Sequence, residues 1–63
     1  MNNSAGQQLR QAREKRQLTL EQAAKATHIR SHYLHALEAD LFDSLPSPTQ
    51  AKGFLRIYAS FLN

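Results

Sequence analysis

The sequence predicts an all-α fold, a compact domain of four helices. Apolar residues recur with the helical period in four segments, and no segment shows the alternation of a half-buried strand. Residues that can cap helix N-termini precede three of these segments, at Ser4, Thr19 and Ser47. Because the chain has 63 residues and no cysteine, its stability must come from one hydrophobic core without disulfides.

The first helix is expected over residues 5–16, with Ser4 as its N-cap. Residues 1–4 are polar, so we expect a flexible N-terminus followed by a single domain over residues 5–63. The other faces of this helix carry glutamine and charge, which places it at the surface. Its inward face is expected to consist of Ala5, Leu9 and Ala12.

Two shorter helices are expected next, over residues 20–26 and 31–39. The second helix begins with a capping box in which Thr19 caps and Gln22 reaches back to it. The turn before the third helix has His28 where positive φ is favoured, and histidine tolerates this better than most residues other than glycine. The apolar residues expected in the core here are Ile29, Leu34 and Leu37.

A connector over residues 40–46 leads to the fourth helix, which is expected to continue to about residue 62. The fourth helix opens with a second capping box, formed by Ser47 and Gln50. Pro48 occupies its first helical position, where no backbone N–H is needed. The connector side chains expected to pin this segment to the core are Leu41, Phe42 and Leu45.

The fourth helix has more apolar surface than docking on a three-helix core requires. Its inward stripe is expected to consist of Ala51, Leu55, Tyr58 and Leu62. A flank formed by Phe54, Ile57 and Phe61 widens the apolar surface to roughly 200° of the circumference, whereas core packing needs about 100°. We therefore expect this flank to be an exposed docking surface. The alternative is that Phe54 or Phe61 completes the core by packing on Phe42 and Leu45.

Positive charge and a glycine mark the same helix. Lys52 and Arg56 lie at i and i+4 on the opposite flank, and no acidic residue occurs after Asp43. Gly53 interrupts the helix interior at a cost of about 1 kcal/mol, which suggests that the Phe42 loop or another protein approaches the backbone there. Contact between the fourth helices of two copies is a further interpretation of this surface.

Residues 9–40 resemble the helix-turn-helix of phage repressors. The matching positions are Leu9, Arg13, Leu18, Thr19, Ala24, Ile29, Leu34, Leu37 and Glu38. The resemblance implies a partly buried, structural ion pair between Arg13 and Glu38. The surface that would face DNA is poorly suited to reading bases, because Leu20 and Ala36 offer no polar group. A DNA-binding module is therefore the alternative function, with the candidate contacts Lys25, Arg30, Ser31, His32 and His35.

A closer resemblance is carried by three strings: IRSHYLHALE at 29–38, LFDSLP at 41–46 and GFLRIYA at 53–59. Over nearly its whole length the chain resembles the N-terminal cytoplasmic domain of RodZ-type cell-shape proteins. This resemblance implies a domain that binds the bacterial actin homologue MreB, mainly through aromatic residues of the fourth helix with basic residues nearby. It also implies a cytoplasmic location, with the full-length protein anchored in the inner membrane by a segment outside this chain.

Phe54 matches one of the aromatic residues through which the resemblance implies binding to MreB, and the resemblance makes Lys52 and Arg56 the candidate charged residues of that contact. The other aromatic residue lies one turn earlier, where this chain has Gln50. Loss of an aromatic hot spot removes about 2 kcal/mol or more of binding free energy. Two interpretations follow: Ile57 and Phe61, on the same face, compensate for this loss, or the chain binds a diverged partner.

Catalysis, metals and cofactors are not predicted. His32 and His35 share a helix, but no carboxylate or thiol at suitable spacing completes a four-ligand zinc site. Glu38, Asp40 and Asp43 lack the alternating oxygen ligands of a calcium loop, and the two glycines are too isolated for a phosphate loop.

The charge of the chain leaves two classes of partner open. A net charge of +3 and a pI of about 9.8 permit nucleic acid or an anionic membrane surface as a partner without requiring either. The last residue, Asn63, directly follows apolar residues, so we expect the chain to be a fragment of a longer protein.

Overall fold

The structure, a computed structural model, describes residues 3–63 and confirms the all-α domain of four helices. The helices are α1 (Ala5–Lys15), α2 (Leu20–Thr27), α3 (Ser31–Glu38) and α4 (Pro48–Leu62), with a short 3₁₀ helix, η1 (Phe42–Ser44), in the connector. Each α-helix ends within one residue of its expected boundary. The expectation of a flexible N-terminus falls partly on residues 1–2, which lie outside the described residues.

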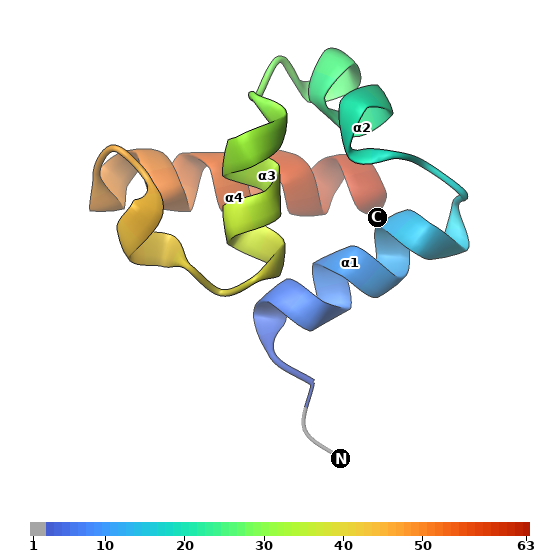
Figure 1. Cartoon of the computed structure of the whole chain (residues 1–63), viewed down its shortest axis with the longest axis horizontal. Coiled ribbons are helices and arrows are strands. Elements are labelled where there is room, and N and C mark those ends of the chain that lie inside the picture. The colour runs from blue at the N-terminus through green and yellow to red at the C-terminus, as the bar shows by residue number, and fades with distance from the viewer. Residues whose placement is uncertain (1–2) are drawn as a thin grey trace.

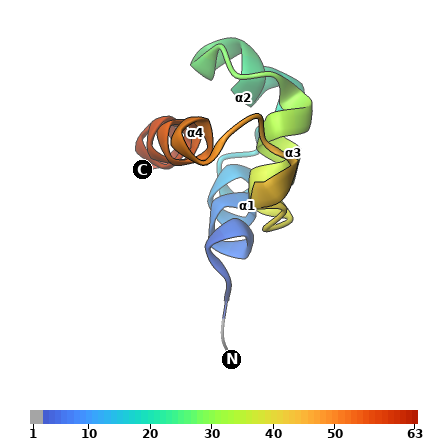
Figure 2. The ribbon, with the colours of Figure 1, turned by 90° about the vertical axis from the view of Figure 1, so that its left-hand side faces the viewer.

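The helices form two layers. In Figure 1, α3 crosses α4, with α1 below and α2 above this crossing. Figure 2, turned by 90°, shows α4 nearly end-on to one side of the other three helices. One face of α4 therefore packs on the helix-turn-helix layer. Among the helices in the described part of the chain, none is long and apolar enough to cross a membrane.

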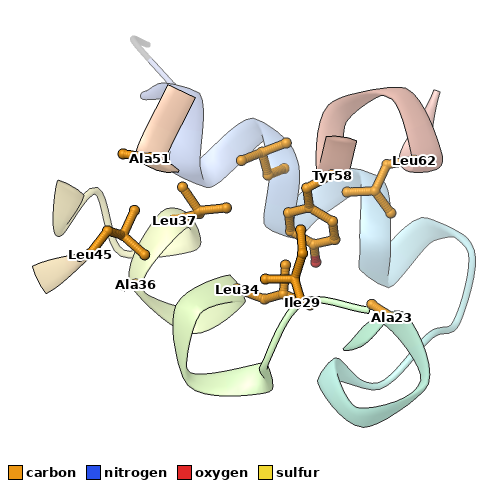
Figure 3. Close-up of a cluster of buried hydrophobic side chains, with 10 residues drawn as sticks. Ala23, Ile29, Leu34, Ala36, Leu37, Leu45, Ala51, Tyr58 and Leu62 are labelled. Carbon is orange, nitrogen blue, oxygen red and sulfur yellow. The ribbon is translucent and has the colours of Figure 1, made fainter. Parts of the chain in front are cut away.

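The core lies between these two layers. Tyr58, Leu34 and Leu37 are its largest fully buried side chains, and Figure 3 shows them with neighbours from α2, the connector and α4. The expected inward stripe of α4 is confirmed at Ala51, Tyr58 and Leu62, while Leu55 is half-buried. The buried apolar residues are Leu9, Ala23, Ile29, Leu34, Ala36, Leu37, Leu45, Ala51, Tyr58 and Leu62.

Capping boxes begin α1 and α2 but not α4. Thr19 and Gln22 form the predicted reciprocal pair, and Ser4 forms the same pair with Gln7, where only a cap at Ser4 was expected. At α4, Ser47 accepts a hydrogen bond from the backbone N–H of Gln50 at 3.1 Å. The described structure has no return hydrogen bond from the Ser47 backbone to the Gln50 side chain. The predicted N-cap at Ser47 is therefore confirmed, but the predicted capping box is wrong.

Within residues 3–63, three residues other than glycine adopt positive φ, each just after a helix: Gln17, His28 and Asp40. The value of 60° at His28 confirms the sequence prediction. After α1 and α3 the chain closes in Schellman motifs, in which the N–H of Leu18 bonds to the carbonyl of Arg13 and that of Leu41 to the carbonyl of Ala36. These bonds satisfy carbonyls at the helix ends that would otherwise lack partners.

The N-terminus of α1 is fixed to the C-terminus of α3. Asp40 accepts hydrogen bonds from the backbone N–H of Gly6 at 2.9 Å and from the Ser4 hydroxyl. A side chain at Gly6 would come within 2.6 Å of the Leu37 carbonyl oxygen, so only glycine allows this approach. The expected inward face of α1 is therefore wrong at Ala5, which is exposed, and Gly6 is buried in its place.

The connector is held by one apolar side chain instead of the expected three. Leu45 is buried, whereas Leu41 and Phe42 remain 52% and 37% exposed. The Schellman turn at Asp40 and the η1 helix set the path of the chain here, and that path leaves Leu41 and Phe42 outside the core. The prediction that they pin the connector is wrong.

Candidate docking surface

The α4 flank, consisting of Phe54, Ile57 and Phe61, is partly exposed. Ile57 is 47% exposed, and the two phenylalanines are half-buried at the edge of the core. Gln50 is exposed at the start of the same helix. The structure thus brings together apolar residues that the sequence assigned to one face, with Ile57 as the most accessible of them.

Phe54 is held against α3 by an aromatic contact. Its ring stacks on that of Tyr33, with centroids 5.4 Å apart and an interplanar angle of 26°. The ring of Tyr33 in turn lies 4.2 Å from that of its neighbour His32. The alternative that Phe54 or Phe61 completes the core is thus partly correct, because both pack at its edge. However, the aromatic ring that Phe54 packs on is that of Tyr33, and not that of Phe42 as expected.

Phe61 is contacted by a cation from Arg16, the C-cap residue of α1. The guanidinium of Arg16 lies 5.1 Å from the centroid of the Phe61 ring and donates a hydrogen bond to the Phe61 carbonyl at 2.6 Å. A cation at this position interacts favourably with the ring and with the negative end of the α4 dipole. The last turn of α4 is therefore stabilised by a residue distant in the sequence.

The predicted charged residues of α4 lie away from this flank. Lys52 is exposed beside an open groove of about 500 Å³ between the connector and α4, whose walls include Phe42, Leu45 and Leu55. Arg56 is exposed on the outer face of the helix. Outside its own helix backbone and chain neighbours, no atom of residues 3–63 lies within 4 Å of where a Gly53 side chain would begin, so the expected approach of the Phe42 loop to this glycine is wrong.

The expected ion pair between Arg13 and Glu38 is present, and it belongs to a larger buried network. Nε and Nη2 of Arg13 lie 2.7 and 3.1 Å from the two carboxylate oxygens of Glu38. Arg13 also donates to the Leu18 carbonyl, and the Tyr58 hydroxyl donates to Glu38. This network joins α1, α3 and α4, so its arrangement indicates a structural role.

Protonation of the network follows from these contacts. The hydrogen bond with Glu38 raises the pKa of Arg13. Burial, together with the hydrogen bond and negative charge of Glu38, raises the pKa of Tyr58 well above its ordinary value. At neutral pH the tyrosine is therefore a neutral hydrogen-bond donor to the glutamate.

The candidate nucleic-acid contacts lie on α2 and α3. Lys25, Arg30, His32 and His35 are exposed and Ser31 is half-buried. Two residues that the sequence placed on the DNA-facing side are in fact packed inward. Ala36 is buried in the core and Leu20 packs against it.

Several contacts at these sites were not predicted. Tyr33 was not singled out, although it is the aromatic residue directly before core Leu34. The Asp40 cap, the Arg16 contact and the Tyr58 hydrogen bond all join residues at least 20 positions apart, so no local sequence pattern predicts them. In the described residues, no cluster of three histidine, aspartate or glutamate side chains could hold a metal ion.

Comparisons with known proteins place the chain in a family. A family profile described as a helix-turn-helix domain matches residues 8–63. The chain is 46% identical over 54 residues to the cytoskeleton protein RodZ of Streptococcus pneumoniae, a match covering 86% of this chain and 20% of the relative. It thus spans about a fifth of that relative's length. No solved structure matches it at a significant level. The chain belongs to this helix-turn-helix family and is a domain of the RodZ type.

Proposed function

We propose that this chain is a non-enzymatic interaction domain of a RodZ-like cell-shape protein and that it binds the bacterial actin homologue MreB through α4. The observation that carries this proposal is the α4 flank, an apolar surface that remains partly exposed after the core is complete. Similarity to a relative named as a cytoskeleton protein supports a cytoskeletal partner. In the full-length protein the domain would lie in the cytoplasm, anchored through a segment outside this chain.

The flank can supply a modest binding free energy. Burying a whole isoleucine side chain is worth about 1.5–3 kcal/mol, and nearly half of Ile57 is still available to a partner. Phe54 and Phe61 have already buried part of their surface within the domain. Gln50 adds little apolar area, so binding depends on Ile57 together with the exposed edges of the two rings.

Co-sedimentation with polymerised MreB from the same organism tests this proposal. Ile57→Ala should weaken pelleting by about tenfold in affinity, which corresponds to about 1.4 kcal/mol. Leu41→Ala is a matched control, because Leu41 is a similarly exposed aliphatic residue (52% against 47%) outside α4. Phe54→Ala should also weaken binding, and circular dichroism must show that its helices are intact. Equal pelleting of the parent and Ile57→Ala would exclude the flank as the contact.

DNA binding is the alternative function. Exposed Lys25, Arg30, His32 and His35 on the helix-turn-helix favour it, whereas burial of Ala36 removes one position from the surface that would face the bases. Contacts with phosphates should therefore dominate. The affinity for duplex DNA should fall steeply with salt and should be weakened by Arg30→Ala. Affinity that is insensitive to both changes would rule this function out.

A further inference from the structure

We propose that the docking surface extends from α4 onto the first turn of α3 and that Tyr33 and His32 are part of it. This inference rests on the proposed function and adds residues from a second helix. The relevant feature is the aromatic row, defined as His32, Tyr33 and Phe54. In this row the ring of Tyr33 contacts both of the others, at centroid distances of 4.2 and 5.4 Å.

The side chains of the aromatic row are more exposed at the α3 end than at the α4 end. His32 is exposed, whereas Tyr33 and Phe54 are half-buried, so each ring supports the next and leaves part of its own surface free. Aromatic side chains that are rigid before binding give contact area at low entropic cost. Because Phe54 is fixed by Tyr33, a partner that covers the free edge of Phe54 must lie close to Tyr33 as well.

This arrangement adds the ring of Tyr33 to the α4 flank, whose own aromatic residues are Phe54 and Phe61. Position 50 holds an exposed glutamine, so α4 alone presents Phe54, Ile57 and Phe61. Tyr33 reaches the same flank through its contact with Phe54, from α3, the helix that crosses α4 in Figure 1. Tyr33 and Phe54 together therefore form an aromatic pair, and aromatic residues are enriched in protein–protein interfaces.

Charge indicates which partner fits this surface. Arg30 is exposed at the start of α3, Arg16 lies over Phe61, and α4 contains no acidic residue. The partner should therefore present apolar side chains bordered by carboxylates. We assign this partner to the same filament subunit that binds the α4 flank, because the aromatic row is continuous with that flank through Phe54.

The test compares two histidines on one helix. His32 and His35 are both exposed on α3, but only the ring of His32 contacts Tyr33. In co-sedimentation with polymerised MreB, His32→Ala should weaken binding several-fold while His35→Ala leaves it unchanged. Tyr33→Leu, which keeps an apolar side chain against the core, should weaken binding by at least about tenfold. Circular dichroism establishes that each variant is folded.

Each outcome decides between the two proposals. If the parent pellets, Phe54→Ala does not, and the His32 and Tyr33 variants pellet like the parent, α3 lies outside the interface and only this inference fails. If the parent does not pellet with confirmed filaments, the proposed function fails and this inference with it. If His32→Ala and Tyr33→Leu instead abolish binding to a single-stranded oligonucleotide and leave filament binding intact, the aromatic row is a base-stacking platform.

Discussion

Replacing each of the two glycines by alanine should change the stability of the domain in opposite directions. Gly6 lies in the first turn of α1 and Gly53 in the interior of α4. In a helix interior, alanine is favoured over glycine by about 1 kcal/mol. The surroundings of each glycine decide whether this gain is realised.

At Gly6 the gain is outweighed by steric overlap. A Cβ atom there would lie 2.6 Å from the Leu37 carbonyl oxygen and 2.8 Å from Oδ1 of Asp40. Relief requires α1 to move away from the end of α3, and overpacking of this kind costs about 1–3 kcal/mol. The same movement weakens the hydrogen bond from the Gly6 N–H to Asp40, and bonds to charged groups contribute about 1.5–3 kcal/mol. We expect Gly6→Ala to destabilise the domain by about 1–3 kcal/mol.

At Gly53 no overlap opposes the gain. Apart from its chain neighbours and its own helix backbone, no atom of the described residues lies within 4 Å of an added Cβ. Gly53→Ala should therefore stabilise the domain by about 0.5–1 kcal/mol. The expected difference between the two variants is therefore about 1.5–4 kcal/mol.

Urea unfolding followed by far-UV circular dichroism measures both effects as changes in midpoint at constant m value. In thermal unfolding, a domain of this size should shift by about 4–8 °C per kcal/mol. Stabilisation by Gly6→Ala would show that α1 does not sit on the end of α3 as described. Destabilisation by Gly53→Ala would show that the backbone of α4 is contacted there, for example in a homodimer.

Three further predictions concern the buried network and the helix ends. Tyr58→Phe should lower the free energy of unfolding at pH 7 by about 1.5–3 kcal/mol. Burial, with the hydrogen bond to Glu38, raises the pKa of Tyr58 in the folded state, so the unfolded state loses this proton first as the pH rises. The free energy of unfolding of the parent should therefore fall by about 1.4 kcal/mol per pH unit above about pH 10. In urea titrations the difference in stability between the parent and Tyr58→Phe should then shrink, and a difference that stays constant with pH would contradict both the burial of the hydroxyl and its bond to Glu38. Gln17→Gly should raise the free energy of unfolding by up to about 1 kcal/mol, because glycine adopts positive φ without strain; a lower urea midpoint would be inconsistent with that φ. Arg16→Ala should increase hydrogen exchange in the last turn of α4, where Arg16 bonds to Phe61; unchanged protection there would show that this contact is not a cap.

The helices could be predicted from the sequence because their signals are local. Caps at Ser4, Thr19 and Ser47 act on N–H groups within three residues, and the apolar period of α4 identifies Tyr58 as inward-facing from its neighbours alone. His28 was predicted in the same way, because its conformation depends on the turn around it. Gln17 and Asp40 adopt the same conformation without a glycine or asparagine to mark them.

The sequence by itself determined the fold class, the helix boundaries within one residue and the apolar flank of α4. Only the tertiary structure decided which parts of that flank stay free. Tyr33 packs on Phe54 and Arg16 covers Phe61, while Leu41 and Phe42 remain outside the core. These outcomes depend on how helices cross and where the connector turns. The connector turns at Asp40 and η1, where no glycine or asparagine marks the positive φ. The helix crossings are set by contacts between residues 20–45 positions apart, which no short window of sequence contains.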